Sequence, residues 1–69
     1  MTKFEDLRVK AGLTITQLAK EADVSRAFID RIEKGQAVRA PLAARVCKVL
    51  SQHLGYEVTI QDLDIPTVR

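Results

Sequence analysis

Residues 13–35 read LTITQLAKEADVSRAFIDRIEKG, and this stretch decides the fold of the chain. Its apolar residues recur at spacings of three and four on both sides of a short break near residue 24, which is the pattern of two amphipathic helices. The break is too short for anything but a tight turn. The sequence therefore predicts two consecutive helices, near residues 15–22 and 26–34, that meet at a sharp corner.

The residues around this corner suit it individually. Ala19 is small enough to let a second helix cross closely, and Val24 can fill the inside of the corner. Asp23 lies where the chain must bend, and aspartate tolerates the left-handed conformation better than most residues do. Ser25 can then cap the second helix by accepting a hydrogen bond from a free backbone amide.

Helix starts and ends are marked along the rest of the chain as well. Three starts have the spacing of capping boxes, and three ends are followed by a glycine that suits the left-handed position there. The capping pairs are Thr2 with Glu5, Thr14 with Gln17 and Thr59 with Asp62, and the glycines are Gly12, Gly35 and Gly55. Pro41 fits the first turn of a further helix. We predict an all-α fold, a compact five-helix bundle with helices near residues 3–11, 15–22, 26–34, 41–54 and 60–64. The less favoured alternative for residues 56–60 is a short strand, because apolar residues alternate there.

Length and composition limit the function. The chain of 69 residues is one domain, residues 1–69, with one cysteine, Cys47, and one histidine, His53, so we expect no disulfide and no metal site, and we place Cys47 in the core. A lone cysteine is typical of a protein from the reducing cytoplasm. No apolar run in the sequence approaches the length of roughly 20 residues that spans a bilayer. We therefore expect a cytoplasmic protein and no membrane partner. The sequence has no paired acids, no activated nucleophile and no phosphate-binding glycine loop. We therefore expect no enzyme activity, no cofactor and no small-molecule ligand.

Charge is distributed unevenly along the chain. Residues 1–55 carry ten Lys and Arg against six acids, a net of +4, whereas residues 56–69 carry three acids against Arg69, a net of −2. Such an asymmetry indicates that the first part faces an anion and that the C-terminal part does not.

The motif resembles the Cro and phage-repressor (XRE-type) helix-turn-helix family closely, and the resemblance extends more loosely over residues 4–63. The residues that match the family pattern are Leu13, Thr14, Leu18, Ala19, Ala22, Val24, Ser25, Ile29, Ile32, Glu33 and Gly35. The resemblance implies a lambda-repressor-like DNA-binding domain that regulates transcription from a bacterial, plasmid or phage promoter. Two residues depart from the pattern: Ile15 stands where the family usually has a phosphate-holding glutamine, and Asp23 replaces the usual turn glycine.

The second helix of the motif carries the residues expected to contact DNA. Ile29 and Ile32 define its buried side, and helix-turn-helix proteins place the exposed side of this recognition helix in the major groove. The predicted base-contacting residues are Arg26, Ala27, Asp30 and Arg31. Arginine can donate two hydrogen bonds to guanine, and a carboxylate can accept one from cytosine N4. The alternative is that Arg26, Asp30 and Lys34, spaced by four, form a solvated ladder of ion pairs.

Residues at the helix starts and after the recognition helix are expected to contact phosphates, because amides and cations that border the groove take that role. They are Thr14, Thr16, Ser25, Lys34, Gln36 and Arg39. In the family, residues at the positions of Arg8 and Glu33 bridge the first and third helices. The resemblance therefore implies that these two residues meet and are structural.

The segment after the fourth helix, about residues 54–68, has more apolar residues than a small core needs. We predict a homodimer interface formed by Leu54, Tyr56, Val58, Ile60, Leu63 and Ile65. A dimer would favour a pseudo-palindromic operator on double-stranded DNA. The alternatives are that these residues complete the core of a monomer, or that the chain is an interaction module, such as an antitoxin, whose C-terminal segment binds another protein.

Overall fold

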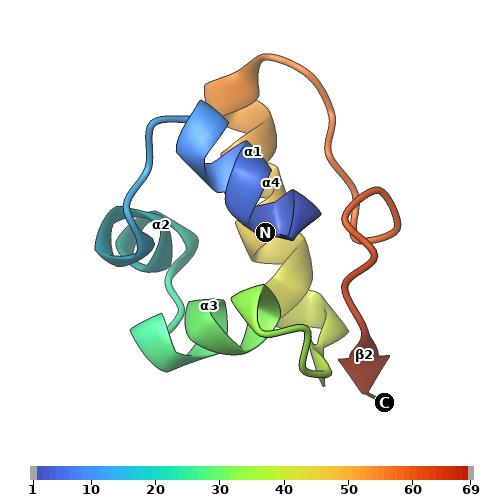
Figure 1. Cartoon of the computed structure of the whole chain (residues 1–69). Coiled ribbons are helices and arrows are strands. Elements are labelled where there is room, and N and C mark those ends of the chain that lie inside the picture. The colour runs from blue at the N-terminus through green and yellow to red at the C-terminus, as the bar shows by residue number, and fades with distance from the viewer. Residues whose placement is uncertain (1, 69) are drawn as a thin grey trace.

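The computed structural model describes residues 2–68, which form four helices and two short strands (Figure 1). In chain order the elements are α1 (Lys3–Lys10), α2 (Ile15–Ala22), α3 (Arg26–Glu33), β1 (Val38–Arg39), α4 (Ala40–Leu54) and β2 (Thr67–Val68). In the view of Figure 1, α1 crosses in front of α4, α2 lies to the left, α3 lies below, and the segment after α4 descends on the right. The long helix α4 is thus surrounded by the shorter elements.

Three of the four helices begin at a side-chain cap. The Thr2 hydroxyl accepts a hydrogen bond from the Glu5 amide at 3.1 Å, and the Ser25 hydroxyl accepts one from the Phe28 amide at 3.0 Å. Thr14 and Gln17 form a reciprocal capping box at the start of α2. Each cap satisfies an amide that has no partner inside its helix. The helix α4 has no such cap and begins with Pro41 in its first turn, where the missing N–H costs nothing.

One hydrophobic core joins all four helices. Its largest fully buried side chains are Phe4, Leu18, Ile29, Val46 and Leu50. Burying a side chain of this size contributes about 1.5–3 kcal/mol, so these residues together are a major source of the stability of the fold. Cys47 is also in this core and is 3% exposed.

The predicted fifth helix is wrong. The Thr59 and Asp62 capping pair does form, with the Thr59 amide 3.0 Å from Asp62 Oδ2 and the Asp62 amide 3.1 Å from Thr59 Oγ1. Residues 60–64, however, make only a turn, because Asp64 takes a left-handed conformation with φ of 54° and Pro66 follows two residues later. A helix cannot propagate through either feature.

The alternative strand at residues 56–60 is absent from the described part of the chain, but an unpredicted pair of strands is present. The strands β1 and β2 are parallel, with Val38 opposite Thr67 and Arg39 opposite Val68. The Val38 amide also donates to the Pro66 carbonyl at 3.0 Å. This pairing fastens the C-terminal segment to the chain that follows α3.

Ser51 holds the other end of the same segment. Its hydroxyl accepts a hydrogen bond from the Val58 amide at 2.8 Å and lies 2.8 Å from the Cys47 carbonyl, to which it donates. Ser51 is on α4, so residues 57–68 run beside that helix and are attached to the domain at both ends.

Half of the residues of the predicted dimer interface lie inside the monomer. Val58, Leu63 and Ile65 are 5%, 5% and 8% exposed, so these three complete the core, as the alternative interpretation expected. Leu54 and Ile60 are half-buried, and Tyr56 is 47% exposed. Of the predicted set, a partner could reach only Leu54, Tyr56 and Ile60 in this conformation.

Cys47 is expected to be an unreactive thiol. Burial, and secondly the nearby Asp62 carboxylate, raise its pKa from 9.0 to about 11. A pKa that is higher by two lowers the thiolate fraction of Cys47 about 100-fold at about pH 8. Ellman's reagent at that pH should therefore modify the native protein at least about 100-fold more slowly than the chain unfolded in guanidinium chloride. Because the folded pKa is the higher one, the stability gained from the protonated thiol is complete below pH 9 and is lost as the pH rises towards about 11. Equal reaction rates in the two states would contradict this prediction.

Candidate nucleic-acid interface

The helices α2 and α3 meet at the corner that the sequence predicted. Asp23 has φ of 57° and ψ of 48°, a left-handed conformation that ends α2, and the Val24 amide donates to the Ala19 carbonyl at 3.0 Å. Ala19 and Ala22 are each 3% exposed, so small side chains let the two helices approach closely. The corner is therefore fixed by backbone hydrogen bonds and by packing.

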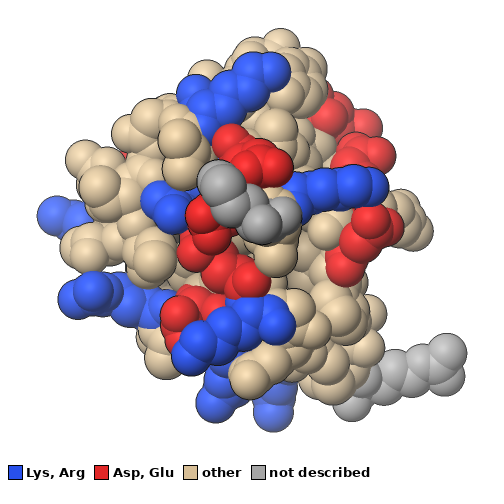
Figure 2. Space-filling model, viewed as in Figure 1, with Lys and Arg blue, Asp and Glu red and all other residues tan. Residues whose placement is uncertain are grey.

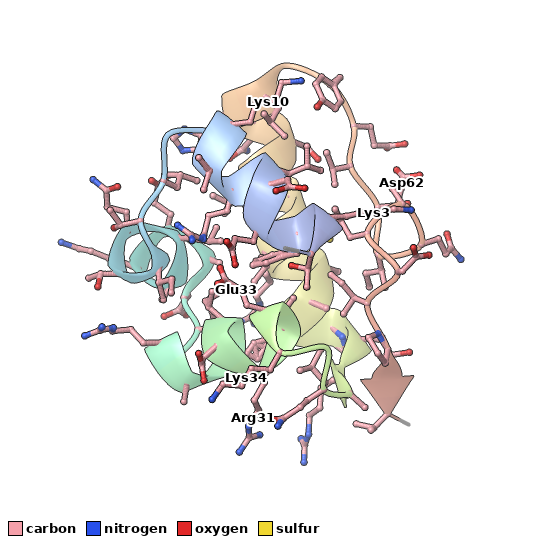
Figure 3. All side chains as sticks on the ribbon, in the orientation of Figure 1. Lys3, Lys10, Arg31, Glu33, Lys34 and Asp62 are labelled. Atoms are coloured by element: carbon pink, nitrogen blue, oxygen red, sulfur yellow. The ribbon has the colours of Figure 1, made fainter. Side chains whose placement is uncertain are left out.

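The recognition helix α3 has one buried and one exposed side. Phe28, Ile29 and Ile32 are buried, which places Phe28 in the core. The residues on the other side are all exposed: Arg26, Ala27, Asp30, Arg31 and Lys34. In Figure 3, the labelled Arg31 extends away from the body of the molecule at its lower edge, below α3, and Figure 2 shows Lys and Arg gathered at that edge. The outside of α3 thus carries three cations, Arg26, Arg31 and Lys34, with the Asp30 carboxylate among them.

The arginines of this surface are free to bind an anion. The ion pairs among residues 2–68 are Lys3–Asp64, Arg8–Glu33, Lys34–Asp30 and His53–Glu21, and none of them includes Arg26 or Arg31. The predicted ladder is therefore only half formed: Lys34 Nζ lies 2.8 Å from Asp30 Oδ2, whereas Arg26 has no ion-pair contact with Asp30.

The exposed Asp30 carboxylate lowers the positive charge of this surface. We expect Asp30→Ala to strengthen binding to a scrambled DNA duplex about threefold at low salt, because it removes a charge that phosphate repels and releases Lys34. The ratio of affinities for the preferred and the scrambled duplex should fall. Fluorescence anisotropy with both duplexes measures this, and weaker binding of the variant to the scrambled duplex would contradict it.

The residues predicted to contact phosphates are all exposed. Thr14 and Ser25 accept capping hydrogen bonds through their hydroxyl oxygens, which leaves each hydroxyl proton available for a phosphate oxygen. Arg39 and Arg31 line one cleft of about 430 Å³, together with Ser25 and Ala27. The fold thus places two guanidinium groups, which form no ion pair with the other residues of 2–68 and are 8 residues apart in the sequence, on a single concave surface beside the recognition helix.

The predicted contact between Arg8 and Glu33 is present. Arg8 Nε donates to Glu33 Oε2 at 2.6 Å, and Arg8 Nη1 donates to the Leu13 carbonyl at 2.9 Å. The two side chains are only 14% and 12% exposed. The guanidinium of Arg8 therefore joins α1, the start of the motif and the end of α3.

Two contacts between side chains near the motif were not predicted from the sequence. His53 Nε2 lies 2.8 Å from Glu21 Oε1, which joins the end of α4 to α2, and Lys10 Nζ lies 5.5 Å from the centre of the Tyr56 ring. Glu21 and His53 are 32 residues apart, and no local pattern links such a pair. Both contacts join exposed side chains, and the sequence constrains the pairing of exposed side chains only weakly.

The tight α2–α3 corner and the exposed basic face of α3 define a helix-turn-helix DNA-binding domain. A sequence model of the helix-turn-helix family matches residues 4–60, and the chain belongs to this Cro and phage-repressor-like (XRE-type) family. Searches of curated proteins and of solved structures returned no significant match. The family consists of DNA-binding regulators that are not normally enzymes. Among residues 2–68, no helix is long and apolar enough to cross a membrane, and no cluster of potential metal ligands occurs.

Proposed function

We propose that this protein binds a specific double-stranded DNA sequence and regulates transcription there as a homodimer on a pseudo-palindromic operator. The observation that carries the proposal is the exposed, unpaired state of Arg26 and Arg31 on the outer face of α3. A helix presented in this way fits the major groove, where arginine donates two hydrogen bonds to guanine.

The surrounding residues have separate roles in the proposed complex. Arg26 and Arg31 contact base edges, with the Ala27 methyl against a thymine methyl where the operator offers one. Thr14, Thr16, Ser25, Lys34, Gln36 and Arg39 contact phosphates and set the register of α3 in the groove. Phosphate contacts carry no sequence information themselves, so the exposed side chains of α3 determine which operator is bound.

Titration by fluorescence anisotropy tests the proposal. The protein is added to a labelled duplex from the DNA upstream of its own gene, and to a scrambled duplex of equal length and composition, at about 50 and 200 mM salt. We expect tight binding that prefers the upstream duplex and weakens steeply with salt, because bound cations displace counterions. Equal weak binding to both duplexes, or no binding by the folded protein, would overturn the proposal.

A further inference from the structure

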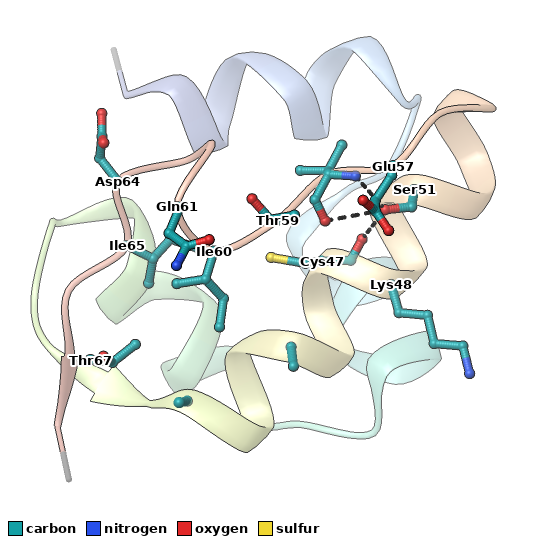
Figure 4. Close-up of a pocket in the computed structure, with 13 residues that line it drawn as sticks. Cys47, Lys48, Ser51, Glu57, Thr59, Ile60, Gln61, Asp64, Ile65 and Thr67 are labelled. Atoms are coloured by element: carbon teal, nitrogen blue, oxygen red, sulfur yellow. Dashed lines mark hydrogen bonds between the residues drawn. The ribbon is translucent and has the colours of Figure 1, made fainter.

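The C-terminal part of the described chain forms a strap, residues 57–68, that runs beside α4. Figure 4 shows it with an open groove of about 960 Å³ between the strap and that helix. At one end of the strap the Val58 amide donates to the Ser51 hydroxyl, and Thr67 lies towards the other end. In Figure 1 that second end, β2, reaches the lower edge of the molecule, where α3 also lies. The strap therefore ends at the same edge as the recognition helix.

The partner of β2 is the short stretch of chain that carries Arg39. In the parallel ladder, Val38 is opposite Thr67 and Arg39 is opposite Val68. The Val38 amide donates to the Pro66 carbonyl at 3.0 Å. The strap is therefore hydrogen-bonded to the residue next to Arg39 and pairs with Arg39 itself.

Apart from its covalent link to α4, few other contacts fix the position of Arg39. Among residues 34–39, which connect α3 to α4, Val38 alone is buried. Arg39 precedes α4 in an extended conformation, with φ of −72° and ψ of 129°, and its side chain makes no capping hydrogen bond with that helix. It also belongs to no ion pair among residues 2–68. The ladder with β2 and the burial of Val38 are thus the main constraints on this stretch of backbone.

The position of this backbone matters because Arg39 shares a cleft with Arg31 of the recognition helix. Phosphate contacts fix the register and orientation of a protein on the duplex. A displaced Arg39 would miss the phosphate that it reaches when α3 is in the groove. We propose that β2 is a positioning element for DNA binding, in which Thr67 and Val68 hold the backbone of Arg39 so that its side chain reaches a phosphate. This inference rests on the proposed function, in which Arg39 is a phosphate contact.

Two double variants test the role of β2 without changing any charge. Thr67→Pro with Val68→Pro removes both amide donors of the strand, whereas Thr67→Val with Val68→Ile keeps them and changes only the side chains. Both residues are exposed, so neither pair of substitutions removes part of the core. Circular dichroism and urea denaturation verify that each protein is folded under the binding conditions. Fluorescence anisotropy then measures the affinity for the preferred and the scrambled duplex at about 50 and 200 mM salt.

We expect the proline pair to weaken binding to both duplexes at least about threefold. The slope of log affinity against log salt should become shallower by about one, which corresponds to the loss of one phosphate contact. The slope is informative because this variant loses no cation of its own. The valine and isoleucine pair should bind both duplexes within about twofold of wild type. In the Arg39→Ala background, the proline pair should weaken binding by less than about twofold, since the contact that β2 positions is already gone.

Three outcomes would overturn the role of β2. They are an unchanged salt slope in the folded proline pair, equal losses in the two double variants, and an undiminished effect of the proline pair in the Arg39→Ala background. If the proline pair is not folded, Thr67→Gly with Val68→Gly replaces it, because glycine weakens a strand without removing its donors, and the same three outcomes apply. A wild type that binds the upstream duplex, with every β2 variant equal to it, overturns only this inference. A wild type that binds no DNA overturns the proposed function as well.

Discussion

Replacing Glu33 by alanine is expected to lower the free energy of unfolding by about 3 kcal/mol, the largest effect of a polar substitution in this chain. The change leaves the Arg8 guanidinium, which is 14% exposed, without its carboxylate partner. A charge held in such a position without compensation destabilises the folded state strongly. For a domain of this size, the loss corresponds to a decrease in Tm of about 12–24 °C.

Urea denaturation followed by circular dichroism measures this loss, and Asp30→Ala is the matched control. Asp30 also pairs with a cation, Lys34, but the two side chains are 52% and 63% exposed. We expect that control to cost only about 0.3–0.5 kcal/mol, because water screens the pair. Equal losses in the two variants would show that the Arg8–Glu33 pair is no more than a surface contact.

Replacing Arg31 by alanine is expected to weaken binding to the preferred duplex by about 10- to 100-fold, which corresponds to about 1–3 kcal/mol for a base contact. Binding to the scrambled duplex should weaken much less, because a base contact is made only at the cognate sequence. Arg39→Ala, which removes a phosphate contact, should weaken binding to both duplexes by a similar factor and reduce the salt dependence. The two arginines of one cleft are thus distinguished by sequence preference.

Lys10→Ala is the control for the lost charge. Figure 3 places Lys10 at the end of the molecule opposite to Arg31. Anisotropy titrations should give an affinity for the preferred duplex within about twofold of wild type, since Lys10 would act on the DNA only through long-range charge. If Arg31→Ala and Lys10→Ala weakened binding equally, Arg31 would have no specific contact with the bases.

Local rules predicted the part of the fold that local interactions determine. The caps at Thr14 and Ser25 and the left-handed conformation of Asp23 each depend on residues within three positions, so spacing in the sequence was sufficient to find them. The same rule failed at Thr59, where the capping pair forms but Asp64 ends the turn at once. A cap predicts where a helix can start and says little about its length.

Contacts between distant residues could not be found in this way. The ladder of β1 and β2 has two residues in each strand, too few for an alternating pattern, and the hydrogen bonds of Ser51 with residues 47 and 58 have no signature in the sequence. The contact of Arg8 with Glu33 was found because the family resemblance supplied it. The burial of Val58, Leu63 and Ile65 was misjudged because composition counts apolar residues without showing which face they cover.

The buried side and the exposed side of α3 have different roles. Phe28, Ile29 and Ile32 hold the helix in the core, whereas the residues on its outer side touch little of the protein itself. Substitutions on the exposed side of α3 can therefore change which DNA sequence is bound at little cost in stability. Substitutions on its buried side would lower the stability and leave the residues that face the DNA unchanged. A library randomised at Arg26, Ala27 and Arg31 would sample new operator preferences on an unchanged scaffold, so the specificity of this domain can evolve, or be engineered, separately from its folding.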